Sequence, residues 1–178
     1  MRQVSDDFLL NMAEVSATLI GLFLVGVFFY VETGFRRVEH AHDVVEPYFR
    51  AGTRIVMVLY AIPLGLPLAL VALEPIWARV LFALLSLTLI AANIDTAVRI
   101  RAVARATGSA ALVVNELVGS AGVLLIVIIP WTLGGLHPTR EDLTWAILLA
   151  FGTGFISIVA VLLSVFDIAR FDTPSNGE

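Results

Sequence analysis

The sequence predicts an all-α integral membrane protein in which five transmembrane helices form one bundle. Hydrophobic residues make up 59% of the 178 residues and charged residues only 15%, whereas soluble domains carry about 25% charged residues. The mean hydropathy is +0.94. Five apolar segments also reach the length of about 18 residues that a membrane-spanning helix needs. We therefore expect residues 1–178 to form a single transmembrane domain.

The first predicted helix covers residues 8–30 and carries a polar stripe. Ser5 is suited to cap this helix. The stripe, whose members recur every three or four residues and so share one helix face, consists of Asp7, Asn11, Glu14, Thr18 and Gly21. An ionised side chain in hydrocarbon costs roughly 3 kcal/mol. We therefore expect this face to contact protein, water or a partner instead of lipid.

Glu14 has two interpretations. In the first, it is a carboxylate that binds a proton or a cation in a pore or between subunits. In the second, burial keeps the carboxyl neutral, and it forms hydrogen bonds with Ser16, Thr18 or another helix. The sequence leaves both interpretations open.

The segment 31–53 is rich in charged residues and is predicted to be a cytoplasmic amphipathic segment at the membrane surface. Pro47 is suited to the first turn of the following helix. That second predicted helix covers residues 55–73 and contains Pro63 and Pro67, each of which removes a backbone donor. We expect either a kink or a broken helix whose free carbonyls form a site.

The third predicted helix, residues 76–98, and the fourth, residues 110–133, share a polar cluster. Its members are Asn93 and Asp95 on the third helix and Asn115 and Glu116 on the fourth. Arg99 follows Asp95 by four residues, which favours an ion pair within one helix. The cluster is either a set of salt bridges near the cytoplasmic surface or an inner vestibule for ions or protons.

The fifth predicted helix covers residues 143–166 and follows a capping signal in residues 139–142. It carries a second stripe, formed by Thr153, Ser157, Ala160, Ser164 and Asp167. Small residues let helices approach closely, and Gly119 and Gly122 on the fourth helix have the same character. These residues are expected to form a packing seam, with pore lining as the alternative. The tail, residues 172–178, is expected to be flexible.

The arginines predict the orientation. Eight of the 11 basic residues fall on the side of the 31–53 segment, the connection after the third helix and the C-terminus. This bias places the N-terminus outside and the C-terminus in the cytoplasm. Trp77, Trp131 and Trp145 would then all lie at the outer interface, as an aromatic belt does.

Several functional classes are excluded or disfavoured. The chain has no cysteine, which excludes disulfides, thiolate chemistry and cysteine metal sites. Its net charge of −4 gives no basic surface for nucleic acid. His40 and His42 are two residues apart and do not share a helix face, which disfavours a metal site. No nucleophile–base motif is present. We therefore expect no catalytic residue, no metal and no cofactor, and the protein is not expected to be an enzyme.

Residues 13–29, AEVSATLIGLFLVGVFF, resemble the first helix of small bacterial multi-pass membrane proteins of uncharacterised function. The resemblance covers one predicted helix of five. It implies an inner-membrane (plasma-membrane) protein of a bacterium, and it carries over no activity and no site residues.

These observations favour a non-enzymatic, homo-oligomeric channel or permeation protein that passes small cations or protons by means of intramembrane carboxylates. Its expected partners are membrane lipids and further copies of itself. The alternative is a structural or regulatory membrane subunit that docks a protein partner through the stripe of the first helix. A membrane enzyme acting on lipid is the weakest hypothesis, because the acidic residues lie at opposite leaflets.

Overall fold

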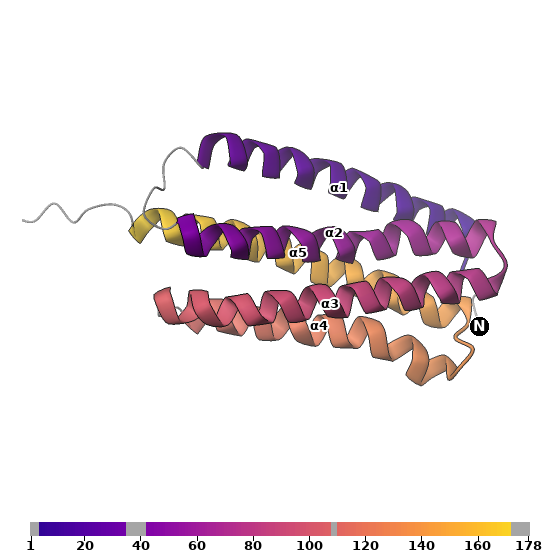
Figure 1. Cartoon of the computed structure of the whole chain (residues 1–178). Coiled ribbons are helices and arrows are strands. Elements are labelled where there is room, and N and C mark those ends of the chain that lie inside the picture. The colour runs from indigo at the N-terminus through magenta and orange to yellow at the C-terminus, as the bar shows by residue number, and fades with distance from the viewer. Residues whose placement is uncertain (1–3, 35–41, 108–109, 172–178) are drawn as a thin grey trace, which may run out of the picture.

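The computed structural model describes residues 4–34, 42–107 and 110–171, with side chains described for residues 4–29, 50–99, 114 and 116–159. Within these ranges the chain forms five α-helices (Figure 1): α1 (Asp6–Gly34), α2 (His42–Ala72), α3 (Pro75–Thr107), α4 (Ala110–Gly134) and α5 (Arg140–Phe171). Each contains a segment of 19 to 25 residues that is long and apolar enough to cross a membrane. The predicted all-α fold, with five helices that are each long and apolar enough to cross a membrane, is confirmed.

The helices alternate in direction, so their connections gather at two ends of the bundle. The α2–α3 and α4–α5 connections lie at one end, which also holds the start of α1, because Arg140 forms an ion pair with Asp6 (Figure 1). Trp77, Trp131 and Trp145 belong to the helix ends that meet there. We call this the tryptophan end.

Two helix starts follow the predicted capping patterns. The backbone N–H of Phe8 donates a hydrogen bond of 3.2 Å to Ser5 Oγ at the start of α1. Before α5, the N–H of Thr139 donates to Asp142 Oδ2 at 2.8 Å, and the N–H of Asp142 donates to Thr139 Oγ1 at 3.4 Å. This reciprocal pair satisfies N–H groups that the helix itself leaves free.

Helix α2 differs from the prediction at its start. It begins at His42 and continues without interruption to Ala72. Residues 42–53 therefore belong to the same continuous helix, with Pro47 inside it, and do not form a separate segment. Residues 35–41, including His40, lie outside the described part. Pro63 and Pro67 do not break the helix either. Membrane helices tolerate proline where neighbouring groups satisfy the freed backbone.

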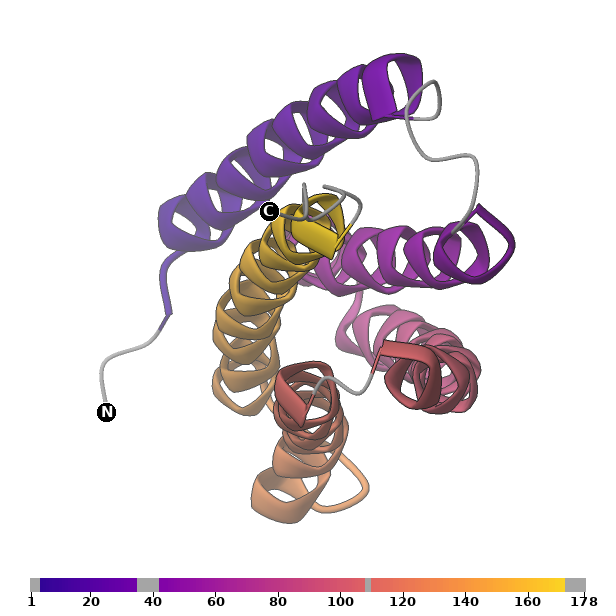
Figure 2. The ribbon, with the colours of Figure 1, turned by 90° about the vertical axis from the view of Figure 1, so that its left-hand side faces the viewer.

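Helix α2 is at the centre of the packing, and α1 is at the periphery. Helix α2 packs against α1, α3 and α5, whereas α4 packs against α3 and α5. Figure 2 shows α1 lying along one side of the other four helices. Only 11% of the apolar span in α1 is buried, compared with 50% in α2. Most of the apolar span of α1 is therefore left uncovered by the other described residues.

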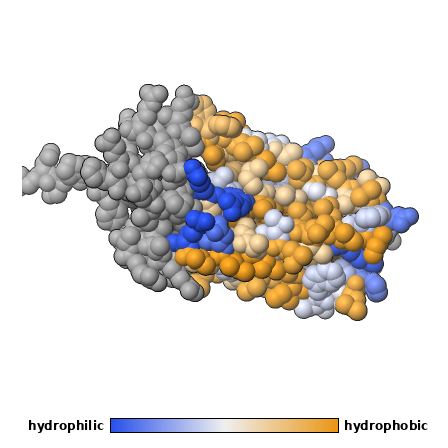
Figure 3. Space-filling model, in the orientation of Figure 1, coloured by the Kyte–Doolittle hydropathy of each residue, from blue (hydrophilic) through white to orange (hydrophobic). Residues whose placement is uncertain are grey.

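The core is apolar and aromatic. Tyr60 of α2 is fully buried, and its ring meets that of Phe151 edge to face with the centroids 6.0 Å apart. Gly154 of α5 lies so close that a Cβ there would stand 3.0 Å from the Tyr60 ring. The outer surface is also rich in exposed hydrophobic residues, and Figure 3 shows hydrophilic residues mainly toward the two ends of the described part. This arrangement suits a multi-pass protein surrounded by lipid.

Candidate functional site

The polar stripe of α1 lies on the exposed face of that helix. Its members, as predicted from the sequence, share one face, and all of them are exposed: Asp7, Asn11, Glu14, Thr18 and Gly21. The opposite face packs on the bundle through Leu9, Ala13 and Ser16, which are buried. The stripe is therefore not covered by any other described helix.

Glu14 is not held by the hydroxyl groups nearest to it in the sequence. The hydroxyl of Thr18 donates a hydrogen bond of 3.0 Å to the backbone carbonyl of Glu14, and the hydroxyl of Ser16 donates to the carbonyl of Tyr60 at 2.7 Å. In the described part of the chain, the carboxylate of Glu14 makes no hydrogen bond and no ion pair. A single copy therefore leaves this carboxylate exposed on the surface of a membrane-spanning segment.

Asp95 forms the predicted ion pair with Arg99, at 3.0 Å between Asp95 Oδ1 and Arg99 Nη2. A second arginine, Arg54 of α2, approaches the other carboxylate oxygen to 3.3 Å. The side chain of Asp95 is 31% exposed, and those of Arg54 and Arg99 are more exposed. Asp95 thus joins α2 to α3 in a surface ion-pair cluster, and two guanidinium groups balance its charge.

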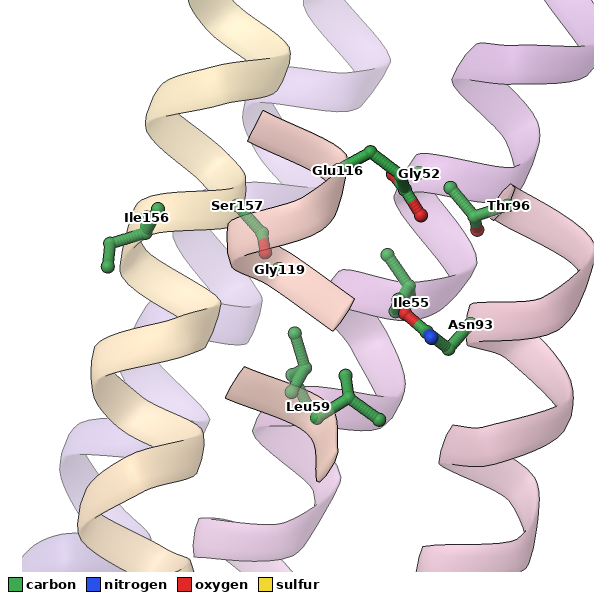
Figure 4. Close-up of a pocket in the computed structure, with 10 residues that line it drawn as sticks. Gly52, Ile55, Leu59, Asn93, Thr96, Glu116, Gly119, Ile156 and Ser157 are labelled. Atoms are coloured by element: carbon green, nitrogen blue, oxygen red, sulfur yellow. The ribbon is translucent and has the colours of Figure 1, made fainter. Parts of the chain in front are cut away.

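A polar cavity of about 30 Å³ lies between α2, α3, α4 and α5 (Figure 4). It is on the side of the Ser16–Tyr60 contact away from the tryptophan end. Its polar lining residues are Asn93, Thr96, Glu116 and Ser157. Two glycines and four apolar residues complete the lining: Gly52, Gly119, Ile55, Leu59, Val123 and Ile156. A cavity of this size can hold about one water molecule or one small ion.

The carboxyl group of Glu116 extends from α4 toward Gly52 of α2 (Figure 4). Its Oε1 atom is buried and has no hydrogen-bond partner among the described residues. Helix α4 also holds Asn93 of α3, because Ser120 Oγ donates a hydrogen bond to Asn93 Oδ1 at 3.3 Å. Thr96 donates its hydroxyl to the carbonyl of Ala92 at 3.0 Å, which leaves its oxygen lone pairs free to accept.

The two glycines of α4 play different roles. A Cβ on Gly122 would stand 2.6 Å from Thr153 Oγ1, so the backbone of α4 approaches the Thr153 side chain closely here. A Cβ on Gly119 would meet nothing within 4 Å, because this residue borders the cavity. Close helix packing therefore depends on Gly122 and not on Gly119.

The structure regroups the residues that the sequence singled out. It brings Asn93, Glu116, Gly119 and Ser157 together around the cavity, although the sequence assigned them to two separate features. Asp95 belongs to the ion-pair cluster instead of the cavity lining. The α1 stripe lies apart from both, and the side chains of Asn115 and Ser164 are outside the described ones.

Six of the ten lining residues were not predicted as site residues, and Gly52 and Thr96 are the two of these that are not large and apolar. Gly52 falls in the segment interpreted as a surface loop, where a small residue has no special meaning. The signal that was available is the position of Thr96, which lies three residues after Asn93 and so on the same helix face.

At the tryptophan end, Arg79 of α3 fixes the α4–α5 connection. Its Nε atom donates to the carbonyl of Pro138 at 3.2 Å, and its Nη1 atom lies 3.4 Å from His137 Nδ1. Gly135 supplies a residue with a positive φ of 60° directly after α4, a conformation that glycine adopts without strain.

Comparisons of the chain with models of protein families, with curated proteins and with solved structures found no match. Among the described residues, no group of three or more His, Cys, Asp or Glu side chains could hold a metal ion. The functional interpretation therefore rests on the α1 stripe, the ion-pair cluster and the polar cavity.

Proposed function

We propose that this protein is a non-enzymatic, homo-oligomeric membrane protein that lets small cations or protons cross the bilayer. In this proposal the α1 stripe of each copy faces the neighbouring copies and lines the path between them. The observation that carries it is the exposure of Glu14, Asn11 and Thr18 on a membrane-spanning helix.

The energetic reason is the cost of polar side chains in lipid. An ionised carboxylate in hydrocarbon costs roughly 3 kcal/mol, and a helix that presents it usually turns it toward protein or water. The described residues of the other helices leave the stripe uncovered, so a second copy is the simplest source of cover. Because α1 packs mainly on α2, its outer face is free to meet another subunit.

The preference for cations follows from the charges. Rings of carboxylates concentrate cations at a pore mouth and disfavour anions. Glu14 contributes one such carboxylate per copy, and it makes no ion pair within the described part of the chain. Asp95 is left out of the path, because Arg54 and Arg99 already balance its charge.

The proposed setting is a bacterial plasma membrane, with the N-terminus outside and the C-terminus in the cytoplasm. The arginine distribution supports this orientation. The grouping of the three tryptophans at one end is compatible with an interfacial belt on the outer side.

The assembly is tested by cross-linking the purified protein, which has no native cysteine. Thr18→Cys places a thiol on the stripe and should give disulfide-linked dimers under mild oxidation. Leu87→Cys is the matched control, because Leu87 is 65% exposed on α3, away from α1. Equal cross-linking of both variants would mean that the stripe is not a specific interface.

Conduction is tested in liposomes that contain the purified wild-type protein or the Glu14→Gln variant. The wild type should dissipate cation gradients, and Glu14→Gln should reduce that flux while the Thr18→Cys cross-link still forms in its background. Well-folded protein that cross-links but gives no flux above empty liposomes would refute conduction. Absence of both results would favour the alternative in which the stripe docks a different membrane protein.

A further inference from the structure

The polar cavity is separate from the α1 stripe in both position and surroundings. The Ser16–Tyr60 hydrogen bond sets the level of α1 against α2, and these helices run in opposite directions. Glu14 is then level with about residue 62 of α2, which lies about 15 Å along the helix axis from Gly52 and about 5 Å from Leu59, the nearest lining residue of α2. The cavity lies between α2, α3, α4 and α5, and α1 contributes no lining residue.

Glu116 differs from Asp95 in having no counter-charge. Asp95 meets two arginines, whereas no ion pair of Glu116 occurs among the described residues, and its Oε1 atom is buried without a hydrogen-bond partner. The Glu116 side chain as a whole is half-buried, but a carboxylate oxygen that is buried without compensation is costly, so the group either takes up a proton or binds a cation. Either event needs space beside the carboxylate, and the cavity supplies that space.

The available ligand atoms are all oxygens. They are the Glu116 carboxylate, the amide oxygen of Asn93 and the hydroxyls of Ser157 and Thr96. Oxygen ligands suit hard cations and not the transition metals that prefer histidine or cysteine. One carboxylate neutralises a monovalent ion, whereas a divalent ion would leave an unbalanced positive charge in a low-dielectric site.

We propose that the cavity binds one small monovalent cation such as Na⁺, with the Glu116 carboxylate as the charged ligand and Asn93 and Ser157 as neutral ligands. A proton on Glu116 competes with this ion. The site lies inside each copy and not on the path proposed between copies, so it does not depend on the proposed function. Binding itself requires neither an oligomer nor flux.

The charged neighbours limit the affinity and shape its pH dependence. On the helices that pack around the cavity, the described charged side chains toward this end are Arg50 and Arg54 of α2 and Asp95 and Arg99 of α3. Asp95 offsets part of the arginine charge through its two ion pairs. Binding should weaken as the solution becomes more acidic, because protons then occupy Glu116 in place of the cation.

The test is equilibrium binding of radioactive Na⁺ to the purified wild-type protein in detergent, at constant ionic strength maintained with choline chloride. We expect saturable binding of one ion per chain, with displacement by unlabelled Na⁺ and by acid. Glu116→Gln should abolish binding, and Ser157→Ala should weaken it by about tenfold, as the loss of groups around a metal site does. Glu14→Gln should bind as the wild type does, whereas Asp95→Asn should weaken binding without abolishing it, because it uncovers the charge of Arg54 and Arg99.

Several outcomes would overturn the proposal. These are no saturable binding by the folded wild type, binding that survives Glu116→Gln, or binding that is lost equally in Asp95→Asn. Ser157→Ala keeps the test decisive if Glu116→Gln fails to fold, because an unchanged affinity in this variant contradicts the ligand assignment. Binding without liposome flux would refute conduction but keep the cation site. Flux without binding would refute the cation site but keep conduction.

Discussion

The hydroxyl of Ser16 in α1 donates a hydrogen bond of 2.7 Å to the backbone carbonyl of Tyr60 in α2. Both residues are fully buried. The carbonyl lies in the turn before Pro63, where the proline ring removes a backbone donor and disturbs the helix. The carbonyl that Pro63 leaves without its helical donor is that of Leu59, so the Ser16 bond does not replace a lost helical bond. It attaches a peripheral helix to the centre of the bundle in the turn that proline disturbs.

Loss of this contact should weaken the attachment of α1. We expect Ser16→Ala to reduce the free energy of unfolding by about 1 kcal/mol, which is typical of hydrogen bonds between membrane helices. The measurement is unfolding of the purified protein in mixed micelles of increasing denaturing detergent. Thr18→Ala is the control and should have little effect on the monomer, because its hydroxyl is exposed and bonds within α1. Equal effects of the two variants would contradict this role for Ser16.

The two glycines of α4 should respond differently to the same added methyl group. Gly122→Ala places a Cβ 2.6 Å from Thr153 Oγ1 and should destabilise the protein by about 1–3 kcal/mol through overpacking. Gly119→Ala meets open space and should cost much less. The same unfolding assay compares the two variants.

Removal of the Thr153 side chain provides the decisive control for this steric explanation. In a double-mutant cycle, Thr153→Ala should recover most of the stability lost in Gly122→Ala, because it deletes the two atoms closest to the new methyl group. Additive losses would mean that Gly122 matters for another reason.

Substitutions at Glu14 and Asp95 should affect cation flux unequally. Glu14→Gln should reduce flux in liposomes, whereas Asp95→Asn should leave it close to that of the wild type, since Arg54 and Arg99 already balance Asp95. The measurement is the initial rate of flux at matched protein incorporation. A larger loss in Asp95→Asn than in Glu14→Gln would require a path through the ion-pair cluster.

Cysteine labelling tests the proposed orientation, because the chain lacks native cysteine. In intact cells, an impermeant thiol reagent should label His137→Cys, in the exposed α4–α5 connection, and should label His42→Cys only after permeabilisation. The reverse pattern would place the tryptophan end in the cytoplasm.

Local sequence patterns predicted most of the fold. The five spans follow from apolar length, and the starts of α1 and α5 follow from side-chain capping by Ser5 and by the Thr139–Asp142 pair. The helix was predicted only from residue 55, because the charged residues before it resemble a surface segment. Pro47, suited to a first turn, pointed to an earlier start, and the structure continues the helix back to His42.

The candidate site was predictable only in part, because its assembly depends on the register between helices. Helical spacing gave the α1 stripe and the Asp95–Arg99 pair, which depend on one helix each. Glu116, Ser157 and Gly52 line the same cavity because of the way α2, α4 and α5 pack. Residue spacing within one helix does not determine that packing. The exposure of the stripe was likewise a property of the whole bundle.

The lengths of the helices make the molecule unequal on its two sides. Away from the tryptophan end, the helices continue past their apolar runs into segments that carry charged residues: residues 42–49 of α2, residues 100–107 of α3 and residues 167–171 of α5. At 1.5 Å per residue, these extensions lengthen the helices by about 8 to 12 Å. At the tryptophan end the connections turn back close to the spans. A protein that meets this molecule from the protruding side would encounter the flanks of helices, whereas one approaching the tryptophan end would encounter short turns.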